Sequence, residues 1–214
     1  MRGLLMKDLQ LMKVNKRMLF IIVALAVVML VMGNSMNSFV IGYVTLVFAF
    51  QVLNTITYDE YDQSGAFLMT MPVTRTLYTL EKYVFAFLSM ALGWGGVVVL
   101  SAVFQLVSKT EGDWIEWLVG AIAVLAVALV LLAISIPVQL RFGGENGRIV
   151  IMTIVVVCVV AVFLFSKVID IELVLDQFFG RLSAYAIPVV IAILVIMYLI
   201  SICVSLRIVK KKEY

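Results

Sequence analysis

The protein has 214 residues, of which 64% are hydrophobic and 14% are charged, and it contains no histidine. Soluble domains are typically about 45–50% apolar and about 25% charged, so the composition, with a mean hydropathy of +1.17, indicates an integral membrane protein. The missing histidine excludes Ser-His triads and His-ligated metals. A net charge of +3 is too small to indicate a nucleic-acid partner.

Five stretches of the sequence carry no charge, and each can lie in a bilayer, where a central charge costs roughly 3 kcal/mol or more. The first stretch, 18–58, is long enough for two spans of about 20 residues, and the turn-forming cluster Gly33–Ser38 divides it. The sequence therefore predicts an all-α integral membrane protein with six transmembrane helices. They are expected near residues 18–35, 39–57, 83–107, 117–138, 149–166 and 184–206.

Lysine and arginine are distributed unequally between the two sides of the predicted spans. Only Lys109, Lys167 and Arg181 lie on one side, whereas the other 13 of the 16 cations lie on the side of the two termini. Cytoplasmic segments of membrane proteins are enriched in Lys and Arg. We therefore expect the N- and C-termini to be cytoplasmic and residues 18–214 to form a single six-span domain.

Residues 1–17 are predicted to form an amphipathic helix that lies in the membrane interface. Leu5, Leu9 and Met12 recur at helical spacing, and charged residues occupy much of the remaining surface. Lysine side chains of such a helix extend toward the lipid headgroups. The helix either anchors the first span or forms an elbow that packs against a cytoplasmic partner.

Residues 58–82 form the longest predicted cytoplasmic connection. Asp62 or Ser64 can cap a short helix that ends before Pro72, and a second helical turn is expected to start at Thr74 or Thr76. A simple connection needs only about 2–8 residues, and exposed apolar residues in a longer one suggest a docking surface. The alternative is that this segment packs on the protein's own cytoplasmic face. The apolar face of the short helix carries Phe67, Leu68 and Met71.

Other motifs in the chain are interpreted as structural. The loop 139–148 contains three glycines that favour tight turns, and the chain lacks the GxxxxGK[ST] pattern of a phosphate-binding loop. The serines within the spans are interpreted as hydrogen-bonding residues between helices. The glycines of the third span favour either close helix packing or a substrate path. These are Ser89, Ser101, Ser135, Ser201 and Ser205, and Gly93, Gly95 and Gly96.

The charge-free stretches contain no residue that could couple transport to an ion gradient. Proton- and ion-coupled transporters usually carry ionisable residues within the membrane, so the sequence favours a transport subunit whose energy comes from another protein. A self-sufficient secondary transporter or channel is the main alternative. A membrane enzyme of lipid metabolism is a third, with Asp59, Glu60 and Asp62 as its only close acidic trio.

Two motifs and the six-span layout resemble an ABC-2-type transporter permease. The first motif is LLMKDLQLMK at residues 4–13, and the second is DQSGAFLMTMPVTRTLYTLEKY at residues 62–83. The chain is most similar to the permease subunits of bacterial phenol-soluble-modulin exporters and to related peptide-immunity exporters. In those proteins an LP-V-[ST]-R…Y…EKY stretch follows the cytoplasmic coupling helix between spans two and three. Here Met71 replaces the usual leucine.

The resemblance implies a function and a set of partners. Two permease copies, identical or closely paralogous, would pair, and each would dock a separate cytosolic ATPase through its coupling helix. ATP and magnesium would bind to that partner, so this chain is expected to be non-catalytic and to hold no cofactor or metal. The cargo would be an amphipathic or hydrophobic peptide, exported across the bacterial cytoplasmic membrane. The permease would also contact membrane lipid, and nucleic acid would not be a partner.

The family's docking positions carry over to the coupling loop and to the start of the third span. Arg75 and Glu81 would be local organisers of this region, and residues 1–17 would be the elbow helix. The expected ATPase-binding residues are Asp62, Ser64, Gly65, Ala66, Phe67, Leu68, Met71, Arg75 and Glu81.

Overall fold

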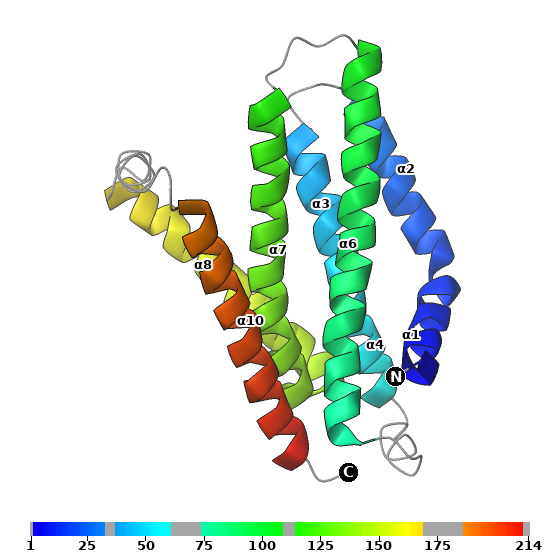
Figure 1. The fold of residues 1–214 in the computed structure, drawn as a ribbon, viewed down its shortest axis with the longest axis vertical. Coiled ribbons are helices and arrows are strands. Elements are labelled where there is room, and N and C mark those ends of the chain that lie inside the picture. Colours follow the sequence, from blue (N-terminus) through cyan, green and yellow to red (C-terminus); the bar gives the residue numbers. More distant parts are fainter. Residues whose placement is uncertain (1, 33–36, 61–73, 109–113, 169–185, 212–214) are drawn as a thin grey trace.

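The computed structural model describes residues 2–32, 37–60, 74–108, 114–168 and 186–211 (Figure 1). The elements in this part of the chain are all α-helices, with no strand among them, which confirms the all-α prediction. The helices are α1 (Arg2–Val14), α2 (Lys16–Met32), α3 (Asn37–Ala49), α4 (Gln51–Glu60), α6 (Arg75–Ser108), α7 (Trp114–Phe142), α8 (Gly144–Val168) and α10 (Ala186–Lys211).

Four of the described helical segments are long and apolar enough to cross a membrane: Asn37–Glu60, Arg75–Val107, Trp117–Phe142 and Pro188–Lys211. A fifth candidate is the pair Gly3–Val14 and Lys16–Val31, which is bent by 65°. In α8 the described apolar segment Asn146–Val157 is shorter than a span requires. The chain is therefore a multi-pass membrane protein, and the count of six spans stays a prediction.

The helices form a bundle in which α6 and α7 stand side by side with α3 (Figure 1). Helix α2 flanks α3 and α6 on one side, and α10 packs against α7 on the other. Helix α8 starts beside α7 and α4 and then extends away from α2. Helix α1 lies at the end of the bundle that holds α4, the start of α6 and the C-terminal end of α10.

Two clusters of buried apolar side chains fill the bundle. The larger one joins α3, α4, α6 and α7 to the last turns of α10, and the smaller one joins α2, α3, α6 and α7 near the opposite end. Many outward side chains of the same helices are exposed, among them Phe20, Leu106 and Ile200. This arrangement suits a protein whose outer surface meets lipid.

Helices α4 and α6 extend beyond the predicted limits of their spans. The expected limits were residues 57 and 83, whereas α4 continues to Glu60 and α6 begins at Arg75. Thr74 caps α6, because its hydroxyl oxygen accepts a hydrogen bond from the backbone N–H of Leu77 at 3.3 Å. The expected helical turn starting near Thr74 is thus confirmed, and the short helix expected before Pro72 lies outside the described residues.

The glycine interpretations are confirmed in part. The predicted loop 139–148 is helical except at Gly143, because α7 runs to Phe142 and α8 begins at Gly144, so the interpretation of Gly144 and Gly147 as turn glycines is wrong. Gly143 separates α7 from α8 and has a φ of 76°, which only glycine adopts without cost. At Gly93 in α6, an added Cβ would lie 2.4 Å from the Cβ of Phe48 in α3, so this glycine permits close helix packing. Gly95 and Gly96 face open space, since no heavy atom lies within 4 Å of an added Cβ.

Candidate functional site

The expected docking residues fall into two groups. Residues 62–71, which include Asp62, Ser64, Gly65, Ala66, Phe67, Leu68 and Met71, lie outside the described residues. Arg75 and Glu81 are described, and both lie in the first turns of α6. The candidate site is therefore built from the two helical flanks of the coupling loop, at the end of α4 and the start of α6.

A buried lysine joins three helices at this place. The Lys82 Nζ on α6 lies 2.6 Å from Asp8 Oδ2 on α1 and 2.7 Å from Asp59 Oδ2 on α4. It also donates a hydrogen bond to the Thr55 hydroxyl of α4 at 3.1 Å. The Lys82 side chain is fully buried. One ammonium group thus connects the amphipathic N-terminal helix to both flanks of the loop.

Further contacts surround this lysine. Lys7 forms an ion pair with Asp59 and lies 3.5 Å from Asp8, and the Tyr78 hydroxyl donates to Asp59 Oδ2 at 3.2 Å. The Lys82 ammonium also lies 5.3 Å from the centre of the Tyr78 ring, within cation–π distance. We refer to Lys7, Asp8, Asp59, Tyr78, Glu81 and Lys82 as the charge cluster.

Glu81 adds a third carboxylate to the charge cluster. Its side chain is fully buried, and its Oε2 lies 3.9 Å from the Lys82 Nζ. Among the described residues, neither oxygen of Glu81 receives a hydrogen bond, and neither does Asp8 Oδ1. Three carboxylates thus face two ammonium groups. Removal of one partner from a buried ion pair costs about 3–5 kcal/mol, so these groups hold α1, α4 and α6 in one arrangement.

The start of α6 also contacts the C-terminal helix. The Arg75 guanidinium donates a hydrogen bond to the backbone carbonyl of Lys210 at 2.9 Å. Two turns further along α6, the Tyr83 hydroxyl lies 2.6 Å from the Ser201 hydroxyl and 2.8 Å from that of Ser205. These contacts link the loop's second flank to α10 and confirm that two of the span serines bond between helices.

Two other span serines form hydrogen bonds of a different kind. The hydroxyls of Ser89 and Ser101 donate to carbonyls of their own helix, those of Ala86 and Val98. Ser135 is buried. The interpretation of these residues as interhelical bonds is therefore wrong for Ser89 and Ser101. A serine within a helix can satisfy its hydroxyl on a carbonyl one turn earlier without any neighbour.

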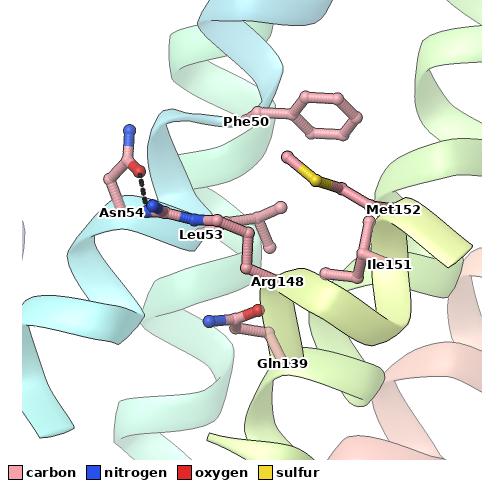
Figure 2. Close-up of a pocket in the computed structure, with 7 residues that line it drawn as sticks. All are labelled: Phe50, Leu53, Asn54, Gln139, Arg148, Ile151 and Met152. Carbon is pink, nitrogen blue, oxygen red and sulfur yellow. Dashed lines mark hydrogen bonds between the residues drawn. The ribbon is translucent and has the colours of Figure 1, made fainter. Parts of the chain in front are cut away.

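A small cavity of about 190 Å³ lies between α4, α7 and the start of α8 (Figure 2). The Arg148 side chain reaches toward α4, where its guanidinium donates to Asn54 Oδ1 at 3.2 Å, and Phe50 and Met152 lie above it in the view (Figure 2). The lining is mostly apolar, with three polar side chains. It consists of Phe50, Leu53, Asn54, Gln139, Arg148, Ile151 and Met152.

Sequence reasoning missed Asp8, Asp59 and Lys82 as site residues. Asp59 and Lys82 each border a charge-free stretch and were therefore assigned to the loop, whereas Asp8 was assigned to the polar surface of the N-terminal amphipathic helix. Their signal was nonetheless present, because Asp8 belongs to the LLMKDLQLMK motif and Lys82 to the EKY motif. The two motifs that carry the family resemblance meet in space at one ion pair.

Comparison with known proteins gives one positive result. The family described as "ABC-2 family transporter protein" matches residues 3–210, nearly the whole chain. Searches of the curated proteins and of the solved structures give no match. Members of this family are membrane permease subunits that are generally non-catalytic and usually pair with a cytosolic ATPase subunit. The chain belongs to the ABC-2 family of transporter proteins, as a permease subunit of an ABC transporter.

Proposed function

We propose that this permease couples a cytosolic ATPase to the export of amphipathic or hydrophobic peptides. The ATPase docks on the coupling loop, chiefly through Asp62 to Met71, and binds the ATP and magnesium itself. Two permease copies, identical or closely paralogous, form the pathway. Arg75 and Glu81 organise the start of α6 beneath the docked partner.

The observation that carries the proposal is the position of Lys82. Its ammonium group contacts Asp59 at the end of α4 and Asp8 on α1, so both flanks of the loop are tied to each other and to the N-terminal helix. Arg75 adds a contact to α10. A displacement that the ATPase imposes on the loop is thereby passed to four helices at once, as a coupling element requires.

The topology proposed for the chain has six spans and cytoplasmic termini, in a bacterial cytoplasmic membrane. Residues 1–17 form the elbow helix, and residues 18–214 form the transmembrane domain. The start of α1 and the end of α10 lie at the same end of the bundle as both flanks of the coupling loop (Figure 1). An even number of spans and a cytoplasmic loop 58–82 account for this arrangement.

An amphipathic cargo is supported by the character of the interior. The cavity beside Arg148 is lined mostly by apolar side chains and has one cation in its lining. A pocket of this kind favours a ligand that is apolar along one side and polar or anionic at an end. The ionisable groups of the charge cluster are already engaged with one another, which suits a mechanical role better than ion transport.

The test is purification of the tagged chain from its native membrane in mild detergent. We expect an ATPase to copurify and the complex to hydrolyse ATP, and the pair Phe67→Asp and Leu68→Asp to remove the ATPase while the chain stays folded. The pair Phe67→Leu and Leu68→Met, which keeps the surface apolar, should retain it. A chain that purifies alone and drives flux in liposomes from an ion gradient contradicts the proposal and favours a secondary transporter.

A further inference from the structure

A second cavity lies between the C-terminal ends of α7 and α10. It has a volume of about 550 Å³ and is lined by Arg141, Val204, Arg207, Ile208 and Lys211. The three basic side chains are exposed, and none of the five lining residues is acidic. The cavity therefore combines three cations with an apolar wall. None of its lining residues belongs to the charge cluster on α1, α4 and α6.

This charge arrangement fits a phosphate group. Arginine guanidinium groups bind phosphate oxygens through paired hydrogen bonds, and lysine adds a point charge. The neighbouring contact from Arg75 to the carbonyl of Lys210 fixes the last turn of α10 beside the cavity. Two helices that approach from different sides thus present their cations to one space.

The wall of the cavity indicates where the phosphate comes from. Val204 continues a stripe of exposed apolar residues along α10 that includes Ile200 and Ile196, each about one turn apart. Such a stripe offers a surface for acyl chains, and the cations stand at its cytoplasmic end in the proposed orientation. Basic pockets between membrane helices on the cytoplasmic side bind anionic lipid headgroups.

We propose that this cavity binds the phosphate headgroup of an anionic lipid of the inner leaflet, with the acyl chains along the exposed face of α10. The lipid contacts α7 and α10 together and so secures the helix that Arg75 and Tyr83 join to α6. The inference concerns a lipid site and does not depend on the identity of the cargo or on peptide export.

A simpler role for the same cations is to complement helix dipoles. Arg141 lies in the last turn of α7, and Lys211 lies in the last turn of α10, where positive charge is favourable. That role predicts a small loss of stability that is the same in every lipid. A lipid site predicts a loss that appears only when an anionic lipid is present, so the two can be separated.

The experiment compares lipid binding by the full chain, with its partner if the two purify together. Native mass spectrometry counts phosphatidylglycerol and phosphatidylcholine retained from defined mixtures, and thermal unfolding is followed with each lipid or with inorganic phosphate. The test variant is the pair Arg141→Gln and Arg207→Gln. The matched control is Arg148→Gln with Lys210→Gln, which removes two exposed cations that do not line this cavity.

We expect the wild type and the control to retain phosphatidylglycerol in preference to phosphatidylcholine and to gain stability from it. The test variant should bind phosphatidylglycerol about tenfold more weakly or worse, since each cation near anionic lipid contributes about 1 kcal/mol. Equal losses in both variants, or no preference between the lipids, would overturn the proposal. Stabilisation by inorganic phosphate equal to that by the lipid would also overturn it, in favour of a soluble anion.

Discussion

The two halves of the bundle hold α6 against its neighbours by different means. At the cytoplasmic end in the proposed orientation, Lys82 forms buried ion pairs with α1 and α4. In the other half, Gly93 packs against Phe48, and the Trp94 ring N–H donates to the Ala121 carbonyl at 2.9 Å. The first half depends on a few directional charges, and the second depends mainly on shape and apolar packing.

This difference shows where a movement can be transmitted. Apolar helix surfaces within a membrane gain no hydrophobic free energy from contact with one another, because lipid tails are equally apolar. A buried ion pair resists displacement, since separation leaves a charge without its partner. Both flanks of the coupling loop end at the charged half, so that half is the one that can follow a docked partner. Four predictions test this contrast, starting with the largest expected effect.

Lys82→Met should be the most damaging change, because it removes the fully buried cation of Asp8 and Asp59 and leaves the partly exposed Lys7 beside them. We expect the free energy of unfolding to fall by about 3–5 kcal/mol, measured by thermal or denaturant unfolding in one detergent. The triple change Lys82→Met, Asp8→Asn and Asp59→Asn should recover most of the loss, since Lys7 is partly exposed and can be solvated. A triple variant as unstable as the single one would contradict the importance of the charges.

Gly93→Ala should affect the apolar half. Its new Cβ would overlap the Phe48 side chain, and overpacking typically costs about 1–3 kcal/mol. Gly95→Ala is the matched control two residues away, where no atom obstructs the new methyl group, and it should be neutral or slightly stabilising. Unfolding of both variants under the same conditions checks the prediction, and equal effects at the two glycines would rule out close packing at Gly93.

Tyr83→Phe removes the hydroxyl that contacts Ser201 and Ser205 on α10. Interhelical hydrogen bonds in membrane proteins contribute about 0.6 kcal/mol on average and at most about 1.7 kcal/mol, so the expected loss lies in this range. Ser89→Ala is the control, because its hydroxyl bonds to its own helix and its removal should cost less. A larger loss from the Ser89 variant would contradict the assigned role of Tyr83.

Arg75→Gln should change stability least. Its bond to the Lys210 carbonyl lies on the surface, where substitutions usually change stability by less than about 0.5 kcal/mol. If the contact transmits movement to α10, ATP hydrolysis by the assembled complex should nevertheless respond less to cargo. Stability and cargo-stimulated hydrolysis measured on the same preparation separate the two effects. Unchanged stimulation would remove Arg75 from the coupling pathway.

Much of the fold follows from the sequence, because it depends on the distribution of charge. Helices α2, α3, α6, α7, α8 and α10 each contain most of a predicted span, and α3 begins at Asn37, within the predicted turn-forming cluster. The predicted ends of the two helices near Asp59 and Lys82 were misplaced, since a charged residue was taken to mark the end of a span. Each of these charges has a partner on another helix, and a partner 52 or 74 residues distant along the chain has no local signature.

The candidate site was also predictable only in part, because its ion pairs join residues that are distant along the chain. The motifs around Asp8 and Glu81-Lys82-Tyr83 marked the correct segments, but the spacing of residues within α1 placed Asp8 on its polar face. In the structure Asp8 is buried and Leu9 is exposed, and the Asp8 carboxylate forms an ion pair with Lys82 of α6. A periodicity argument counts apolar residues and cannot detect an ion pair to another helix.

The most direct test of the central claim is a double-mutant cycle on Asp8 and Lys82. The free energies of unfolding of the wild type, Asp8→Asn, Lys82→Met and the double variant are measured on the full chain in one detergent. If the charge cluster joins α1 to α6, the double variant will be more stable than the sum of the single losses predicts, by about 1–3 kcal/mol. Losses that add within about 0.5 kcal/mol would show that the two helices are held by other contacts and would contradict the account.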